Sequence, residues 1–301
     1  MMLNLFKKKA PQPQKLSALL RVIGDRASGK TSYMASLARW PNADPLSPVQ
    51  SVIPVGETGK ELVSKAQDIL EQGLELEPSA LDASASQMKD YTLQITLKGQ
   101  FSWKNPKVKM GSQLVDLNIS CKDYAGEFFN DLIYQPDNPL LQDYLEDCLQ
   151  ATGIMFLVDG NSRRKDSEYA SGLEKFLTAL DRTAMVLSQR KICLVLTKCE
   201  QSELWVNRHK PAFLAQARFP LIYRQLQTWQ KMGAGTVNYF TNSAFGMLGN
   251  KYLEPNVDLL TRNRDGVTAV IKDPRRWRPF GLVAPIYWLC TGQRHKELDK
   301  G

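Results

Sequence analysis

The sequence predicts a three-layer α/β fold with a mostly parallel sheet, and three observations support this prediction. Short apolar strands alternate with amphipathic helices along most of the 301 residues, as expected for helices that cover both faces of a parallel sheet. Two strands near residue 100 follow each other closely enough to form a hairpin, which adds one antiparallel edge strand. A glycine-rich turn at residues 24–31 separates the first strand from the first helix.

The first third of the chain contains one strand, two helices and two long loops. Residues 16–23 form an apolar run that ends at a glycine, and residues 31–40 have helical spacing that stops before a proline. Residues 41–58 contain four prolines, so we expect mostly loop there. A helix is expected at 61–74, followed by a second loop at 78–90.

Alternating apolar and polar residues predict a strand at 91–103 with one solvated face. A lysine-rich turn at 104–112 joins it to a second strand at 114–121. Regular alternation of helices and strands then continues to the end of the chain. The expected helices are 140–149, 167–187, 211–231 and 282–290, the expected strands are 153–158, 192–197 and 236–240, and a basic loop is expected at 261–279.

Composition excludes several classes of protein. Five scattered cysteines and two histidines favour neither a disulfide framework nor a zinc site, and we expect a reducing cytoplasm. Apolar runs are much shorter than the roughly 18 residues that span a bilayer. The amino-terminal segment has its basic residues after its apolar ones, whereas a signal peptide has the opposite order.

The net charge of +8 is concentrated at the two ends of the chain. Residues 1–15 carry four lysines and no acidic residue, and residues 262–300 carry nine basic and four acidic residues. A nucleic-acid-binding protein usually spreads its basic residues over a folded face, so we do not expect nucleic acid as a partner. The basic tail could make a weak contact with a membrane surface; the plainer interpretation is a solubilising tail.

The glycine-rich turn matches the phosphate-binding pattern GxxxxGK[ST]. Its glycines let successive backbone N–H groups point at phosphates, and the following helix adds positive potential. Lys30 is expected to pair with the β and γ phosphates and the Thr31 hydroxyl to bind Mg²⁺. The expected nucleotide-binding residues of this segment are Gly24, Asp25, Arg26, Ala27, Ser28, Gly29, Lys30, Thr31 and Ser32.

A second motif, Asp123-Tyr-Ala-Gly126-Glu127, follows the strand predicted at 114–121. An aspartate at the carboxyl end of a strand can hold Mg²⁺ through water, so Asp123 is a candidate metal residue. Gly126 can present a bare N–H to the γ phosphate. The pattern alone also fits a solvated turn, and its position beside the phosphate-binding strand favours the functional interpretation.

A third group of residues is suited to reading a base. Thr197-Lys198-Cys199-Glu200 ends one predicted strand, and Ser243-Ala244 follows the next. An apolar lysine stem can lie along a purine face. The Glu200 carboxylate can accept two N–H bonds that guanine offers and adenine does not, and backbone N–H groups near Ser243 and Ala244 can donate to the guanine carbonyl oxygen.

These motifs come in the order and strand positions of Ras-like P-loop GTPases of the translation-factor-related class, and the chain resembles that family over residues 17–293. The detailed motifs look most like bacterial double-GTPase-type proteins, a group implicated in signalling or conflict systems. The resemblance implies a P-loop NTPase of the Ras-like G-domain type, with an insertion at about 41–90 before the second strand. It also implies GTP or GDP with Mg²⁺ as ligands, slow hydrolysis used as a switch, and an effector or activating protein of unknown identity.

Several positions depart from the family pattern. Glu200 stands where the family has Asp, which moves the carboxylate by roughly 1.3–1.5 Å, and Thr197 replaces the usual Asn. Glu127 stands at the position of the water-positioning Gln; it either orients water or is a surface acid that repels the phosphate. Arg26 either supplies charge at the γ phosphate or faces solvent. The candidate catalytic residues are therefore Lys30, Glu127 and Arg26.

Two questions stay open at this level. The Mg²⁺ ligand of the first switch should lie in the insertion, where Ser47, Ser51 and Thr58 are candidates. A P-loop ATPase, or a nucleotide-binding interaction module with negligible turnover, would carry the same phosphate-binding turn. We expect a flexible basic tail at 1–15 and one domain at 16–301, in the cytoplasm or at the periphery of a membrane.

Overall fold

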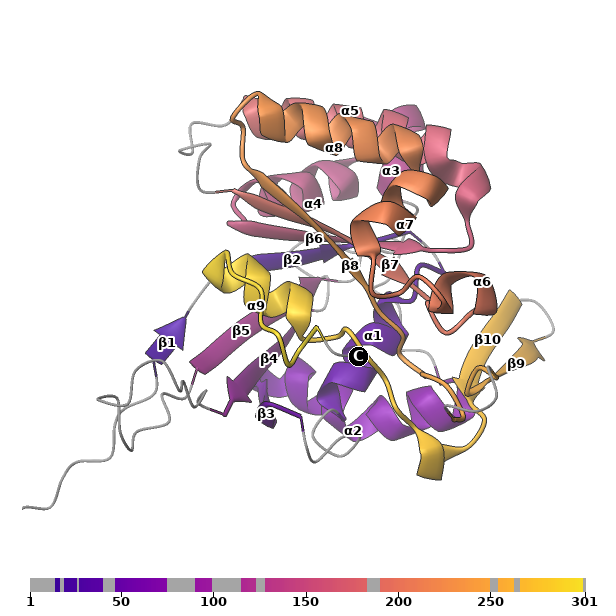
Figure 1. Ribbon diagram of the computed structural model, residues 1–301. Helices are drawn as coiled ribbons and strands as arrows, with labels where there is room; N and C mark the ends of the chain where they lie inside the picture. Colours follow the sequence, from indigo (N-terminus) through magenta and orange to yellow (C-terminus); the bar gives the residue numbers. More distant parts are fainter. Residues whose placement is uncertain are drawn as a thin grey trace, which may run out of the picture.

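A layer of strands with helices on both faces organises the chain (Figure 1). The computed structural model describes residues 14–16, 19–25, 27–39, 47–74, 90–98, 115–122, 128–182, 190–249, 254–262 and 266–299. None of the helices in these ranges is both long and apolar enough to cross a bilayer.

Two ladders make up the central layer. One has the order β1-β5-β4-β3 and the other the order β2-β6-β7-β8, and β2 lies beside β5, so the two ladders continue each other. The strands of the second ladder are parallel, and β1 is parallel to β5, whereas β4 runs antiparallel to both β5 and β3. The described strands are β1 (Gln14–Leu16), β2 (Leu20–Ile23), β3 (Val49–Val55), β4 (Asp90–Leu97), β5 (Val115–Lys122), β6 (Gly153–Asp159), β7 (Lys191–Thr197), β8 (Thr236–Thr241), β9 (Val257–Arg262) and β10 (Gly266–Ile271).

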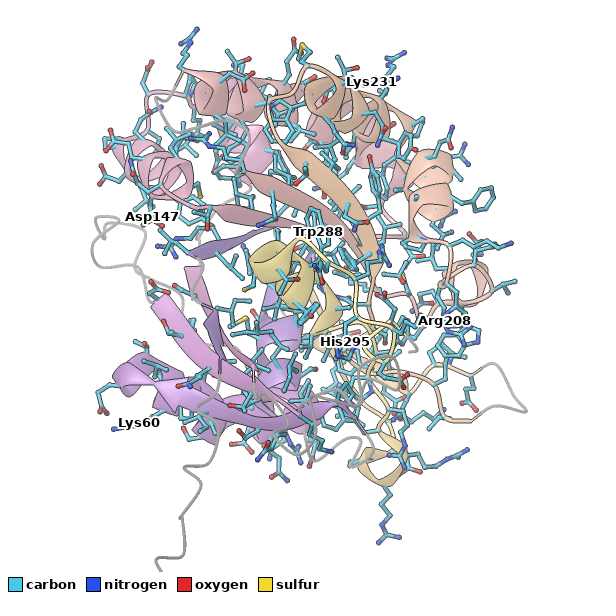
Figure 2. All side chains as sticks on the ribbon, turned by 60° about the vertical axis from the view of Figure 1, so that its left-hand side comes forward. Lys60, Asp147, Arg208, Lys231, Trp288 and His295 are labelled. Atoms are coloured by element: carbon cyan, nitrogen blue, oxygen red, sulfur yellow. The ribbon has the colours of Figure 1, made fainter. Side chains whose placement is uncertain are left out.

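Helices bury two apolar cores, one on each face of the layer. The first core contains α1, α2 and α9, and the second contains α3, α4, α5, α7 and α8. In Figure 2, Lys60 of α2 and Lys231 of α8 mark these opposite faces. The described helices are α1 (Lys30–Ala38), α2 (Gly56–Gln72), α3 (Phe128–Tyr134), α4 (Pro139–Leu149), α5 (Asp166–Asp181), α6 (Ser202–Trp205), α7 (Pro211–Arg218), α8 (Pro220–Lys231) and α9 (Ala284–Thr291), with 3₁₀ turns η3 (Arg163–Lys165) and η5 (Pro274–Arg276).

Strand β6 shows why its sequence is apolar throughout. Ile154, Phe156 and Val158 belong to the core under α3, α4 and α5, while Met155 and Leu157 belong to the core under α1 and α9. Successive side chains of a strand point to opposite faces, so a strand covered on both faces needs apolar residues at every position. The structure therefore confirms the three-layer α/β fold with a mostly parallel sheet.

The segment predicted as a loop at 41–58 is partly ordered into regular structure, which the sequence prediction missed. It contains β3 and the first turn of α2. β3 is the outer strand of its ladder and pairs with β4 alone, so Pro54 interrupts no second ladder. The predicted antiparallel strand is present as β4, with β3 on its outer side.

Two later predictions also differ from the structure. The helix predicted at 211–231 is divided into α7 and α8, because Pro220 disfavours helical geometry at the preceding residue and Phe219 has φ −134° and ψ 63°. The basic loop predicted at 261–279 instead contains the end of β9, all of β10 and η5. β1 begins two residues before the predicted start of the domain. The turn predicted at 104–112 and most of the loop predicted at 78–90 lie outside the described residues.

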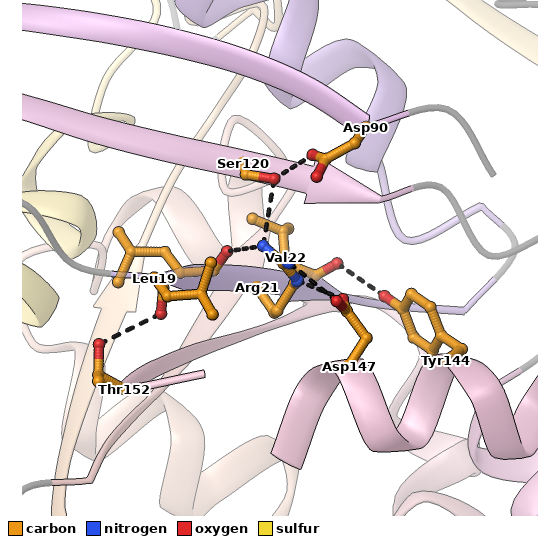
Figure 3. A network of polar contacts seen from close by, with 9 residues as sticks. Leu19, Arg21, Val22, Asp90, Ser120, Tyr144, Asp147 and Thr152 are labelled. Atoms are coloured by element: carbon orange, nitrogen blue, oxygen red, sulfur yellow. Dashed lines mark hydrogen bonds and ion pairs between the residues drawn. The ribbon is translucent and has the colours of Figure 1, made fainter. Parts of the chain in front are cut away.

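A buried polar network fastens β2 to its neighbours (Figure 3). The Arg21 guanidinium donates from Nε and Nη2 to the Asp147 carboxylate on α4, and from Nη1 to Ser120 Oγ on β5 at 3.1 Å. The Ser120 hydroxyl donates in turn to Asp90 on β4. Burial opposes the charge of Arg21, but the hydrogen bonds to Asp147 and its negative charge outweigh burial and raise the pKa of Arg21.

Candidate functional site

The carboxyl ends of four strands meet at one edge of the central layer. β2 leads there into the glycine-rich turn, β6 ends at Asp159, β7 at Thr197 and β8 at Thr241. The neighbours of β2 are β5 on one side and β6 on the other, so the direction of strand addition reverses at this point. Ligands of open α/β sheets bind outside the carboxyl ends of strands at such a switch point.

The turn at residues 24–29 has the tight backbone that a phosphate cradle requires. A Cβ atom on Gly24 would lie 2.4 Å from Ser28 Oγ and 2.7 Å from the Leu157 carbonyl oxygen, so only glycine fits there. Ala27 and Gly29 have φ of 62° and 90°, and the Ser28 N–H donates to the Asp25 carbonyl oxygen at 3.0 Å. Backbone N–H groups alternating between right- and left-handed conformations form concave anion sites.

Lys30 and Thr31 open helix α1 directly after this turn. The Lys30 ammonium donates to the Gly24 carbonyl oxygen at 2.6 Å, so the positive charge lies on the turn itself. The Thr31 hydroxyl makes no hydrogen bond to any other residue that the structure describes, and Ser32 is half-buried beside it. No cluster of three or more His, Cys, Asp or Glu side chains occurs within the described ranges. Thr31 lies in the first turn of α1 beside Lys30, where its hydroxyl could supply one ligand to a Mg²⁺ ion held together with phosphate oxygens.

The Asp25 side chain is directed toward helix α3. Its side chain is buried, and Oδ1 accepts a hydrogen bond from the Phe129 N–H at 3.2 Å, in the first turn of α3. Any contribution of Asp25 to phosphate binding therefore comes from its backbone, while its carboxylate joins the turn to α3.

Thr197 joins the glycine-rich turn to the end of β7. Its hydroxyl donates to the Ser28 carbonyl oxygen at 2.7 Å, and the side chain is buried. Thr197 therefore holds the end of β7 against the glycine-rich turn.

Lys198 adopts the left-handed conformation, with φ of 59°, which is uncommon for a residue other than glycine. Its ammonium forms an ion pair with Asp159 Oδ2 at 2.6 Å, so the stem of the lysine is held across the ends of β6 and β7. Asp159 was not among the residues expected from the motifs. The available signal was an acidic residue directly after a wholly apolar strand, and its register partner on β7 is Thr197.

Glu200 is a deeply buried acid of the site, at 2 % exposure, as is Asp25. Its Oε2 atom is buried and has no hydrogen-bond partner among the described residues. Burial raises the pKa of Glu200, while hydrogen bonding from the Ser243 hydroxyl and the charge of Lys198 act in the opposite direction. A buried acceptor without a donor is costly, so this oxygen is suited to a ligand that brings N–H groups.

The loop after β8 completes the edge. The N–H of Gly246 donates to Ser243 Oγ at 2.7 Å. The Ala244 carbonyl oxygen accepts from Ser36 Oγ of α1 at 3.1 Å and from Trp277 Nε1 at 2.8 Å. Ser243 and Ala244 are therefore fixed relative to Glu200 on one side and to α1 on the other.

The structure thus brings most of the expected residues to one edge. Those that it places there are Gly24, Asp25, Ala27, Ser28, Gly29, Lys30, Thr31, Ser32, Thr197, Lys198, Glu200, Ser243 and Ala244. Arg26, Asp123, Gly126 and Glu127 lie outside the described residues.

The three candidates for the first-switch ligand have other surroundings. Ser47 is buried and its Oγ accepts from the Val49 N–H at 3.2 Å. Ser51 lies on β3, three strands away from β2 in the layer, or about 14 Å at the usual strand spacing. The Thr58 hydroxyl donates to the Asp90 carbonyl oxygen at 2.7 Å. The Ser47 and Thr58 hydroxyls are therefore engaged by backbone groups, and Ser51 lies on the outer strand of its ladder.

Comparison with known proteins gives weak likenesses only. No protein-family model matches the chain, and no curated protein is similar to it. One similar structure is an ADP-ribosylation-factor-like GTP-binding protein, the small COPII coat GTPase SAR1 of Encephalitozoon cuniculi in complex with GDP, at 15% identity over 75% of this chain and 70% of that chain with a TM-score of 0.28. Another is the GTPase-like domain of S. cerevisiae Ski7 bound to GTP, at 12% identity over 80% of this chain and 45% of that chain with a TM-score of 0.37. At these scores neither likeness carries an argument about the ligand.

Proposed function

We propose that this chain is a Mg²⁺-dependent guanine-nucleotide-binding protein that hydrolyses GTP slowly and acts as a molecular switch. The observation that carries the proposal is the buried Glu200 carboxylate, with its Oε2 atom lacking a donor among the described residues, at the same sheet edge as Lys30. Guanine offers adjacent N1–H and N2–H donors to a carboxylate, and adenine does not.

Each part of the edge has one task in this proposal. The backbone of residues 24–29 and the Lys30 ammonium bind the phosphates, and Thr31 holds Mg²⁺, which when bound neutralises charge on the phosphate oxygens. The Lys198 stem, fixed by Asp159, lies along the purine face. Thr197, whose hydroxyl donates to the Ser28 carbonyl oxygen, holds the segment with Lys198 and Glu200 in place against the glycine-rich turn.

The switching part of the proposal depends on residues outside the described ranges. Asp123 and Gly126 would sense the γ phosphate and release the loop after hydrolysis, and Glu127 and Arg26 are the candidate catalytic residues beside Lys30. Unassisted hydrolysis in Ras-like proteins is on the order of 10⁻⁴ s⁻¹, so an activating protein is part of the proposal.

The biological setting is likewise proposed from the sequence. The resemblance of the motifs to bacterial double-GTPase-type proteins supports a role in signalling or conflict systems. We place the chain in the cytoplasm, where its basic amino-terminal tail could touch an anionic membrane surface.

Calorimetric titration of the nucleotide-free protein with GDP and then ADP, both with Mg²⁺, tests the proposal. We expect GDP to bind at least a hundredfold more tightly, about 2.7 kcal/mol. Equal or tighter binding of ADP would replace the guanine-nucleotide assignment by that of a P-loop ATPase. A multiple-turnover assay with and without cell extract then separates an assisted GTPase from a binding module with negligible turnover.

A further inference from the structure

A cavity of about 500 Å³ lies beside the base-reading loops and is formed by residues other than those of the phosphate turn. Trp205, Met247, Leu248 and Phe280 supply its apolar wall. Its size falls within the range of small-molecule pockets, which combine an apolar wall with a few polar groups.

Arginines dominate the charged part of this cavity. Arg208, Arg275, Arg276 and Arg278 line it, and Glu297 is the one acidic residue among its lining residues. Within the described part of the chain, the side chains of Arg275 and Arg276 form no ion pair. The cavity therefore has an excess of positive charge.

Arg208 gives this charge a defined orientation. Its guanidinium carbon lies 3.6 Å from the centre of the Trp205 ring, and Nη1 donates to the Trp205 carbonyl oxygen at 3.0 Å. The Nε atom is buried and has no hydrogen-bond partner among the described residues. Burial lowers the pKa of Arg208, with no acidic group acting in the opposite direction. Figure 2 shows Arg208 on the flank opposite Asp147.

The walls of the cavity continue into the base-reading loops. Phe280 and Ser243 exchange two backbone hydrogen bonds of 3.1 Å, and Ser243 is the residue whose hydroxyl acts on Glu200. The Thr241 hydroxyl donates to the Arg208 carbonyl oxygen at 2.6 Å. A ligand in the cavity would therefore contact Phe280 and Arg208, which are hydrogen-bonded to the segment that contains Ser243.

We propose that this cavity is a second ligand site that binds a compact polyanion carrying two or more phosphate groups. Guanidinium groups bind phosphate oxygens through paired N–H donors. The apolar wall lowers the local dielectric and strengthens that attraction. The guanidinium groups of Arg275 and Arg276, which are exposed and form no ion pair in the described part of the chain, supply the donors.

Titration with tripolyphosphate tests the site, with binding measured by calorimetry. Because the phosphate turn can also hold this probe, the key protein is the Lys30→Ala variant, in which that contribution is removed. We expect Lys30→Ala to retain one tripolyphosphate site, and orthophosphate to bind at least tenfold more weakly. Adding Arg208→Ala, or the pair Arg275→Ala and Arg276→Ala, should weaken the retained site tenfold or more.

Arg164→Ala in the same background is the matched control, because Arg164 is an exposed arginine of η3 outside the cavity. The proposal is overturned if Lys30→Ala alone abolishes tripolyphosphate binding, or if Arg164→Ala weakens it as much as the cavity variants do. The Arg275 and Arg276 side chains are exposed, so their variants remain informative if Arg208→Ala fails to fold. The result does not depend on the base preference at Glu200, so failure here and failure of the guanine-nucleotide proposal are separate outcomes.

Discussion

In the proposed function Glu200 reads the base, and exchanging one of its functional groups tests this role. In Glu200→Gln the side chain keeps its length, but an amide NH₂ replaces a carboxylate oxygen, so a donor faces the base where an acceptor stood. We expect GDP to bind at least tenfold more weakly and xanthosine diphosphate, which has a carbonyl oxygen in place of the guanine N2 amine, to bind more tightly. Competition between the two nucleotides for one fluorescent analogue measures the change.

The matched control for that exchange is Glu203→Gln on α6, where the side chain is 73% exposed. It should leave both nucleotide affinities unchanged. A Glu200→Gln protein that binds GDP as tightly as the wild type would show that Glu200 does not contact the base.

The burial of Glu200 also makes a prediction about pH. Burial raises the pKa of this carboxyl above its ordinary value, so a fraction of the protein carries it protonated in weakly acidic solution. The guanine N–H groups need the ionised form as acceptor, so GDP affinity should rise with pH through the raised pKa and level off above it. Calorimetric GDP titrations between pH 4.5 and 8 test this, and Glu200→Gln should remove the rise.

Local spacing explains which site residues could be predicted. Lys30, Thr31, Lys198 and Glu200 each lie within a few residues of a strand end, and the strand alone brings them to the edge. The ion pair of Asp159 with Lys198 joins residues 39 positions apart, and no pattern within one segment encodes such a contact. For the same reason, the sequence predicted that Asp25 belongs to the glycine-rich turn but did not predict its hydrogen bond to Phe129 of α3.

At the scale of elements, the Asp25 carboxylate links the phosphate turn to α3. In Asp25→Asn the charged acceptor is lost at nearly constant size, and a hydrogen bond to a charged buried group contributes about 1.5–3 kcal/mol. We expect the free energy of unfolding to fall by about that amount, and the Phe129 amide hydrogen to exchange faster. Denaturant unfolding and hydrogen exchange measure the two effects; Asp137→Asn, at an exposed position between α3 and α4, should change neither.

Element prediction failed where position in the sheet decides the outcome. Pro54 indicates loop by local rules, yet an outer strand tolerates it because one of its edges has no partner strand. The strands β9 and β10 were missed because basic residues gather around them, from Arg262 to Arg278, although Asp265-Gly266 between two apolar runs is a hairpin signal. For the segment with Pro54, only its tertiary position at the outer edge of the ladder distinguishes strand from loop.

At the scale of the whole molecule, the layer order followed from the strand and helix alternation, because parallel strands need covered faces and right-handed crossovers. The alternation of strands and helices does not predict which strands of the two ladders lie beside each other. β2 forms its ladder with β6, and β5 forms its own with β1 and β4. Side chains across the boundary between β2 and β5 therefore contribute to holding the halves together.

Arg21 is the side chain that crosses this boundary in Figure 3. Arg21→Ala would leave the Asp147 carboxylate without its bidentate partner and Ser120 without the Arg21 donor. The Arg21 side chain is 6% exposed. Breaking a buried ion pair by removing one partner costs about 3–5 kcal/mol. We expect a loss of that size in the free energy of unfolding, measured by denaturant titration.

The double variant Arg21→Ala with Asp147→Ala separates the ion pair from the other consequences of truncation. Because the second change removes the carboxylate that lost its Arg21 partner, the double variant should be less destabilised than the sum of the two single variants. If the two effects simply add, Arg21 and Asp147 do not stabilise each other, and the cost of Arg21→Ala comes from its other contacts, including the bond to Ser120 across the boundary. If Arg21→Ala instead converts one transition into two, the ladder of β2, β6, β7 and β8 unfolds separately from that of β1, β5, β4 and β3. The glycine-rich turn begins at the end of β2. If Arg21→Ala unfolds in two transitions and loses GDP affinity over the first of them, nucleotide binding depends on the contact between the two ladders.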